Sequence, residues 1–140
     1  MALVQTATNE FRTGLMSGSY DFNTDTFKIA LYNNDADLNE TTSVYTTANE
    51  VVASGYSAGG AVLTVSVTPT TGPSGDIAYV SFNNASWSGA ISARGALIYD
   101  VTNSNKTVCV LDFGSEKTSV TTFEVQFPPA TNTSAIIRVT

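Results

Sequence analysis

The sequence predicts an all-β protein, an antiparallel two-layer sandwich or jelly roll with one short N-terminal helix, and three observations support this. Apolar residues recur with a period of two in several short runs. Thr, Val, Ile and aromatic residues, which fit a pleated surface, are frequent, whereas straight-chain helix formers are scarce. Turn-forming residues separate the runs. So many closely spaced strands favour a sandwich over a parallel α/β sheet.

The N-terminal segment is the region with a helical pattern. Ala7, Phe11 and Leu15 follow one another at intervals of four residues, which places them on one helix face. Gly18 then stands where a helix C-cap is expected. We therefore expect one short helix over about residues 6–17.

From residue 26 onward the pattern is that of strands. Phe27, Ile29 and Leu31 alternate with the residues between them, and the acidic, amide-rich stretch 33–40 is typical of an exposed loop. Further strands are expected at 61–68, 77–83, 90–100, 107–113, 122–127 and 135–140. Turn residues at 69–75, 102–105 and 114–117 separate several of them, which gives about seven or eight strands in all.

The chain length fits a single domain over residues 1–140, and neither an internal repeat nor an interdomain linker is visible. The apolar runs 62–67 and 108–111 would promote association as open sheet edges, because unpaired edges template pairing. They are therefore either central strands or covered by a partner. The apolar run at 135–140 is expected to be ordered rather than a loose tail.

The composition disfavours several classes of function. The chain has no His, so it lacks the usual general base near neutral pH and the commonest metal ligand. Its net charge of −6 disfavours nucleic acid as a partner. No signal peptide or membrane-spanning run is apparent, so we expect synthesis in the cytoplasm and no membrane partner. We also expect no metal and no cofactor.

Two features resemble reactive sites but are better explained structurally. The string at 55–59 matches the G-x-S-x-G nucleophile elbow, yet Ser57 has no His to accept its proton and a strand pattern follows it. We therefore expect a glycine-rich loop there. The single cysteine, Cys109, lies in an apolar run, where a small buried and unreactive thiol is the favoured interpretation.

Acidic residues offer two further candidate sites. The strings 21–25 and 35–39 resemble the start of a calcium loop, but both lack the glycine and the glutamate that such a loop needs later, so turns are favoured. Paired carboxylates could perform glycoside hydrolysis. The residues available for this are Asp76, Asp100, Asp112, Glu116 and Glu124. Because no two of them can be placed together from sequence, we expect no enzymatic activity.

Trp87 is the only tryptophan, and small polar residues flank it. An exposed indole there would serve as a carbohydrate-stacking platform or as an interface anchor. The alternative, which we favour, is a core side chain. The six tyrosines, Tyr56 among them, are open to the same two interpretations.

Three blocks of sequence, at 11–32, 55–60 and 93–100, together resemble the small virion structural proteins of tailed bacteriophages. The size and strand pattern are similar to the capsid decoration, or cement, proteins that clamp the major capsid shell. The resemblance covers most of the chain, and tail proteins share its features. It implies a jelly-roll-like fold, self-association and no catalysis, and it assigns no role to any individual residue.

The resemblance leads to the expectation of a non-enzymatic protein on the capsid exterior that binds and stabilises the shell of major capsid protein. A dimer or trimer would contact the shell through strand edges, loops and the N-terminal segment. The candidate interface residues are Leu3, Val4, Phe11, Tyr56 and Trp87. Two alternatives remain open: a receptor- or glycan-binding module of a tail fibre, and a structural subunit of the tail or connector.

Overall fold

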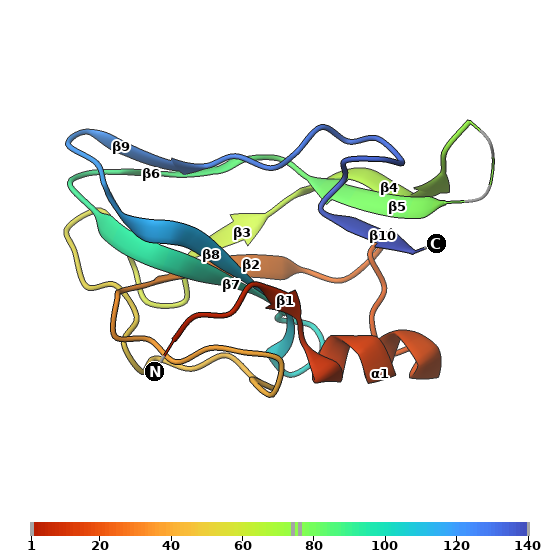
Figure 1. Cartoon of the computed structure of the whole chain (residues 1–140), viewed down its shortest axis with the longest axis horizontal. Helices are drawn as coiled ribbons and strands as arrows, with labels where there is room; N and C mark the ends of the chain where they lie inside the picture. The colour runs from red at the N-terminus through yellow and green to blue at the C-terminus, as the bar shows by residue number, and fades with distance from the viewer. Residues whose placement is uncertain (1, 74, 76, 140) are drawn as a thin grey trace.

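A computed structural model describes residues 2–73, 75 and 77–139 of the chain. Its strands form two layers (Figure 1). One layer is a five-stranded sheet in the order β1-β8-β7-β2-β3. The other holds a three-stranded sheet, β10-β5-β4, beside the strand pair β6-β9. The elements in chain order are β1 (Thr6–Ala7), α1 (Asn9–Ser17), β2 (Phe27–Tyr32), β3 (Ala61–Leu63), β4 (Val65–Thr71), β5 (Ala78–Phe82), β6 (Ala85–Ser88), β7 (Ser92–Asp100), β8 (Lys106–Thr118), β9 (Thr122–Val125) and β10 (Ile137–Val139).

The structure confirms the predicted all-β sandwich with one short helix. All the pairings between these strands are antiparallel. The strand orders do not establish the jelly-roll connectivity that the resemblance implies.

The five-stranded sheet is buried on both faces. On one face Phe27, Ile29 and Leu31 belong to the core between the layers, with Phe82 and Trp87 among their partners in the other layer. On the opposite face a second core cluster gathers around sheet residues such as Tyr32 and Tyr99. Segments outside the sheet complete this second cluster with Leu3, Ala36, Leu38 and Tyr45.

This second cluster buries the opposite face of β2 and corrects one expectation. Ala30 and Tyr32, placed by the alternation on the face opposite Phe27, are fully buried, because the loop after β2 covers that face. The stretch 33–40 is correspondingly not wholly exposed, since Ala36 and Leu38 are buried within it. Asp35 and Asp37, which flank Ala36, remain exposed at the surface.

Helix α1 begins later than predicted. Thr6 and Ala7 instead pair with β8 as β1, and the Thr8 side chain caps the helix by accepting the Phe11 N–H at 3.2 Å. The predicted C-cap is confirmed, because Gly18 adopts the left-handed conformation at φ 76°.

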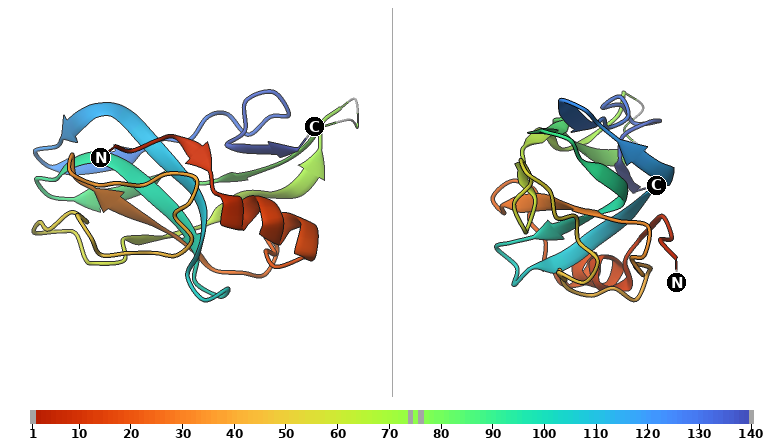
Figure 2. Two further views of the ribbon diagram at one scale, coloured as in Figure 1. Left: turned by 60° about the horizontal axis from the view of Figure 1, so that its bottom comes forward. Right: turned by 90° about the vertical axis from the view of Figure 1, so that its left-hand side faces the viewer.

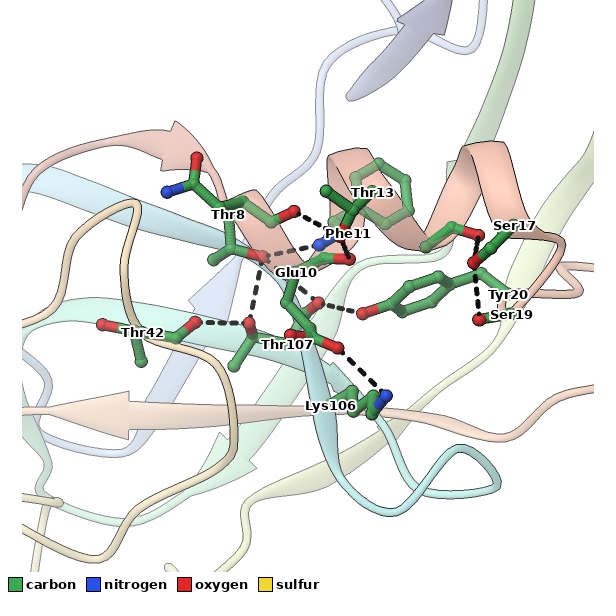
Figure 3. A network of polar contacts seen from close by, with 12 residues as sticks. Thr8, Glu10, Phe11, Thr13, Ser17, Ser19, Tyr20, Thr42, Lys106 and Thr107 are labelled. Atoms are coloured by element: carbon green, nitrogen blue, oxygen red, sulfur yellow. Dashed lines mark hydrogen bonds and ion pairs between the residues drawn. The ribbon is translucent and has the colours of Figure 1, made fainter.

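A buried set of hydroxyl contacts fixes the start of α1 to β8 (Figure 3). The Thr8 hydroxyl lies 3.3 Å from the Thr107 carbonyl oxygen and 3.0 Å from the Thr107 hydroxyl. The Tyr20 hydroxyl donates to the same Thr107 carbonyl at 2.6 Å. Lys106 and Glu10 add an ion pair at 3.0 Å. The helix is thus held at its N-terminal end, while its C-terminal end carries the exposed Met16.

The other strand boundaries differ from the predictions in specific ways. The run 61–68 is not one strand, since β3 ends at Leu63 and β4 begins at Val65 in a different sheet. The strand β6 was not predicted, because its small polar residues hide the alternation of Ala85 and Trp87 toward the core. The expected turn at 114–117 lies inside β8, where Gly114 has a positive φ of 86°.

Some expectations fall on residues outside the described ones. These are Asp76 of the candidate carboxylates, Ser74 of a predicted turn and Thr140 at the end of the last predicted strand. The strand β10, which lies within that expected strand, pairs with β5.

Candidate functional site: an apolar groove beside helix α1

Two adjoining hollows lie between α1, β8, β10 and β5, and together we call them the α1–β10 groove. The first, of about 370 Å³, lies toward β1 and β8, and the second, of about 280 Å³, lies toward β5. They share four apolar lining residues, Phe11, Leu15, Ile137 and Val139. Figures 1 and 2 show β1, α1 and β10 grouped in this part of the molecule.

The groove exposes apolar side chains. Phe11 is buried at its floor, whereas Leu15 is 41% exposed and Val139 is 55% exposed. Met16, 83% exposed, follows Leu15 on the helix. Water therefore contacts a good part of this apolar lining in the isolated subunit, which is typical of a binding surface.

Two arginines line the first hollow. Arg12, on α1, donates to the neutral oxygens of Asn9 at 3.1 Å and Thr6 at 3.0 Å. Arg138, on β10, is exposed beside the same hollow. The ion pairs found among the described residues lie elsewhere, at Arg94–Asp112 and Lys106–Glu10. The first hollow thus combines an apolar lining with positive charge, whereas the acidic residue Asp21 lines the second hollow.

Sheet edges form a second candidate surface. The apolar run 62–67 is divided between β3, at the edge of the five-stranded sheet, and β4, at the edge of the three-stranded sheet. Two register shifts and Pro69 interrupt β4, features that weaken an edge for further pairing. On β3, Val62 is 61% exposed. The run 108–111 lies in β8, between β7 and β1, and is thus more central.

The five sequence-predicted interface residues lie in different places. Leu3, Phe11, Tyr56 and Trp87 are buried within the subunit, and Val4 is 47% exposed. Phe11 reaches the surface only as the floor of the α1–β10 groove. The core interpretation of Trp87 therefore holds in the isolated subunit, where it packs beside Tyr56 and Phe123.

A buried carboxylate organises the loop that covers the second core cluster. One oxygen of Glu50 accepts the Tyr45 hydroxyl at 2.6 Å, and the other accepts the Tyr56 hydroxyl at 2.5 Å and the Gly59 N–H at 2.8 Å. The Tyr56 hydroxyl also accepts the Leu31 N–H at 2.9 Å. Burial, with the hydrogen bond to Glu50, raises the pKa of Tyr56 well above its usual range. This network connects the loop to β2. The Tyr56 hydroxyl stays protonated and donates to Glu50.

A pair of acids lies at the opposite end of β2. Asp100 is fully buried, and its Oδ2 atom has no hydrogen-bond donor among the described residues. Burial, followed by the hydrogen bond and charge of Asp25, raises the pKa of Asp100 to about 7. A shared proton therefore joins the two carboxyl groups below that pH.

The other candidate sites are structural in character. Ser57 lies in an exposed loop, as predicted, and the loop needs Gly60 because a Cβ there would lie 1.8 Å from the Ile29 carbonyl oxygen. In the calcium-like string at 21–25, Asp21 accepts the Asn23 N–H at 2.9 Å, a local turn contact. Cys109 is buried, and burial raises the pKa of its thiol to about 12.

The described carboxylates of the glycosidase hypothesis have separate partners. Asp100 faces Asp25, and Asp112 accepts from Arg94 at 2.9 Å, which holds the pKa of Asp112 below its usual value. Glu124 accepts from Gln126 at 2.9 Å, and Glu116 is exposed. Within residues 2–73, 75 and 77–139, no group of three or more Cys, Asp and Glu side chains is arranged to hold a metal ion.

The sequence offered weak signals for these features. Asp25 lies in a calcium-like string and Asp100 is one of the candidate glycosidase carboxylates, but only the fold brings the two residues together. Leu15 belongs to the apolar stripe of the helix, a pattern that indicates burial, so its exposure in a groove could not be read from the chain. Arg138, between two apolar residues of a strand, was the clearest signal that was missed.

Comparison with protein-family models, with curated proteins and with solved structures found no match to this chain. In the part of the chain that the structure describes, no helix is long and apolar enough to cross a membrane.

Proposed function

We propose that this protein is a non-enzymatic virion structural protein, a capsid decoration protein that binds and stabilises the assembled shell of major capsid protein. The sequence blocks that resemble small phage virion proteins supply the family assignment. The observation that carries a binding role is the α1–β10 groove, an apolar surface with two arginines at its first hollow that is left open in the isolated subunit.

The physical logic of such a role is selective binding. A protein that binds the assembled lattice but not its free subunits shifts the equilibrium toward the lattice. Self-association into a dimer or trimer would increase this effect, because linked sites bind at a high effective concentration. The open β3 edge at Val62 supports self-association, since an exposed apolar edge strand is a template for pairing.

The glycan-binding alternative draws no support from Trp87. An indole that is 7% exposed has no free face on which a sugar ring could stack.

The test uses purified shells of the phage that encodes this chain, prepared without it. We expect the added protein to co-sediment with assembled shells and to raise their melting temperature, but not to bind unassembled major capsid protein. A cryo-electron-microscopy map should then show ordered copies on the shell exterior. Copies confined to the tail, or no binding to shells, would contradict the proposal.

A further inference from the structure

The α1–β10 groove specifies the kind of partner that fits it. We propose that it binds an extended polypeptide segment that carries apolar residues on one face and acidic residues at the groove rim. The assignment of this segment to the major capsid protein rests on the proposed function, whereas the chemistry of the segment rests on the groove alone.

The apolar lining favours an extended occupant. Ile137 and Val139 are two residues apart on β10, so they project from the same side of the strand, and both line the groove. Phe11 and Leu15 face them from one side of α1. A segment in extended conformation presents its alternate side chains to one face, and that face matches this lining.

Backbone groups at the groove favour the same occupant. The groove is lined by β1, at the edge of the five-stranded sheet, and by β10, at the edge of the three-stranded sheet. An edge strand has unpaired N–H and C=O groups along its outer side. An added strand would pair with these groups, which is a common way for proteins to bind extended peptides.

Charge complementarity determines that the segment is acidic. Arg12 and Arg138 supply two of the six cationic side chains of a chain that has twelve acidic ones, and both line the same hollow. Arg12 contacts only neutral oxygens in the hydrogen bonds found for it. Guanidinium groups pair best with carboxylates. Because the chain has a net charge of −6, an acidic segment is attracted chiefly to the first hollow, and its acidic residues must lie there rather than beside Asp21 in the second hollow.

The experiment uses the full chain and a fluorescein-labelled nine-residue peptide, TVEVTVEVT, with blocked ends. We expect saturable binding by fluorescence anisotropy, weakened by 0.5 M salt because exposed charges are screened. The variant with Arg12→Gln and Arg138→Gln should bind about fivefold more weakly. Lys117→Gln, which removes an exposed cation on β8 outside this groove, is the matched control and should leave binding unchanged.

Three results would overturn the inference: no saturable binding, equal binding of the peptide TVKVTVKVT, or the same affinity in the double variant. Backbone amide shifts on α1 and β10 should locate the bound peptide, and shifts confined to other strands would also contradict it.

Binding to shells separates this inference from the proposed function. If the peptide binds as expected but the protein ignores shells, the groove chemistry stands and the capsid assignment falls. If the double variant binds the peptide more weakly but decorates shells as well as the original chain, the decoration role stands and the assignment of the segment to the major capsid protein falls.

Discussion

At the scale of single residues, Asp100 gives the protein a specific dependence on pH. Its pKa in the folded state is raised from 3.8 to about 7, so between these values the folded protein holds a proton that the unfolded chain releases. This contribution to stability is therefore complete below about pH 4 and is lost as the pH rises through 7. We expect the free energy of unfolding to fall by about 1 kcal/mol from pH 5 to pH 8, roughly half of what the unscreened shift would give over that interval.

Urea denaturation at several pH values measures this fall, and Asp100→Asn is the control. An amide in place of the carboxyl group donates to Asp25 at every pH, as the protonated acid does. The variant should therefore lose the dependence between pH 5 and pH 8. If it retains the same slope, another group is responsible.

Tyr56 gives a second prediction at this scale. Tyr56→Phe removes a buried hydroxyl that donates to Glu50 and accepts from the Leu31 N–H. We expect a loss of about 2 kcal/mol, because the buried Leu31 N–H loses its acceptor while the Glu50 oxygen loses one donor and keeps the Gly59 N–H. The control is Tyr45→Phe, which removes the donor to the other oxygen of Glu50. Tyr45 is only half-buried, so water can replace its hydroxyl, and the loss should be about 1 kcal/mol.

Thermal and urea unfolding of both variants provide the measurement. Equal losses of unfolding free energy in the two variants would mean that the contribution of these hydrogen bonds to stability does not depend on their burial.

The surroundings of some residues could be predicted from the sequence, and those of others could not. Burial of Cys109 follows from its apolar neighbours alone, and the loop around Ser57 follows from its glycines. The Glu50 network could not be predicted, since its partners come from positions 45, 56 and 59, and no local pattern shows which of the six tyrosines would converge on one acid.

At the scale of elements, α1 depends on its first turn. Thr8→Val keeps the shape of the side chain but removes the acceptor of the Phe11 N–H and the contact with the Thr107 carbonyl. We expect a loss of about 2 kcal/mol in unfolding free energy, because a helix cap and a buried hydrogen bond are lost together. Thr13→Val is the matched control, since its exposed hydroxyl bonds only carbonyls of its own helix.

The control should change the stability by less than about 0.5 kcal/mol. Amide hydrogen exchange in α1 should accelerate in Thr8→Val and not in Thr13→Val. Unchanged exchange in both variants would show that the contacts with Tyr20 and β8 hold the helix without the cap.

The elements that were predicted well are those whose local pattern and tertiary surroundings agree. Strands β2 and β7 are long apolar runs and lie at the centre of a sheet, so β2 matches the start of its expected run and β7 ends where predicted. The division of 61–68 into β3 and β4 depends on the change of sheet at Thr64, a tertiary event that leaves the apolar pattern unbroken.

At the scale of the whole molecule, the sandwich leaves two surfaces for assembly, the α1–β10 groove and the β3 edge. The five-stranded sheet is covered on one face by the second layer and on the other by the loop that Glu50 anchors, so its faces are not available. Contacts with other subunits must therefore use the groove, the edges and the loops.

Self-association through β3 makes a prediction about the assembled state. If two copies pair β3 with β3 about a twofold axis, Val62 of each copy lies in the contact. Val62→Lys places a like charge from each copy at the same edge, which opposes pairing. We expect the original chain to sediment as a dimer and the variant to sediment as a monomer at the same concentration.

Val52→Lys is the control for the added charge. Val52 is 98% exposed in the loop after β2, so the change adds the same positive charge away from the edge. Both variants should unfold at nearly the same urea concentration, because neither side chain is buried. If both variants lose association equally, the cause is the added net charge and not the position of the residue. If neither variant loses association, the contact between copies lies on another surface. Loss only in Val62→Lys would place the contact at β3 and leave the groove free for a different partner.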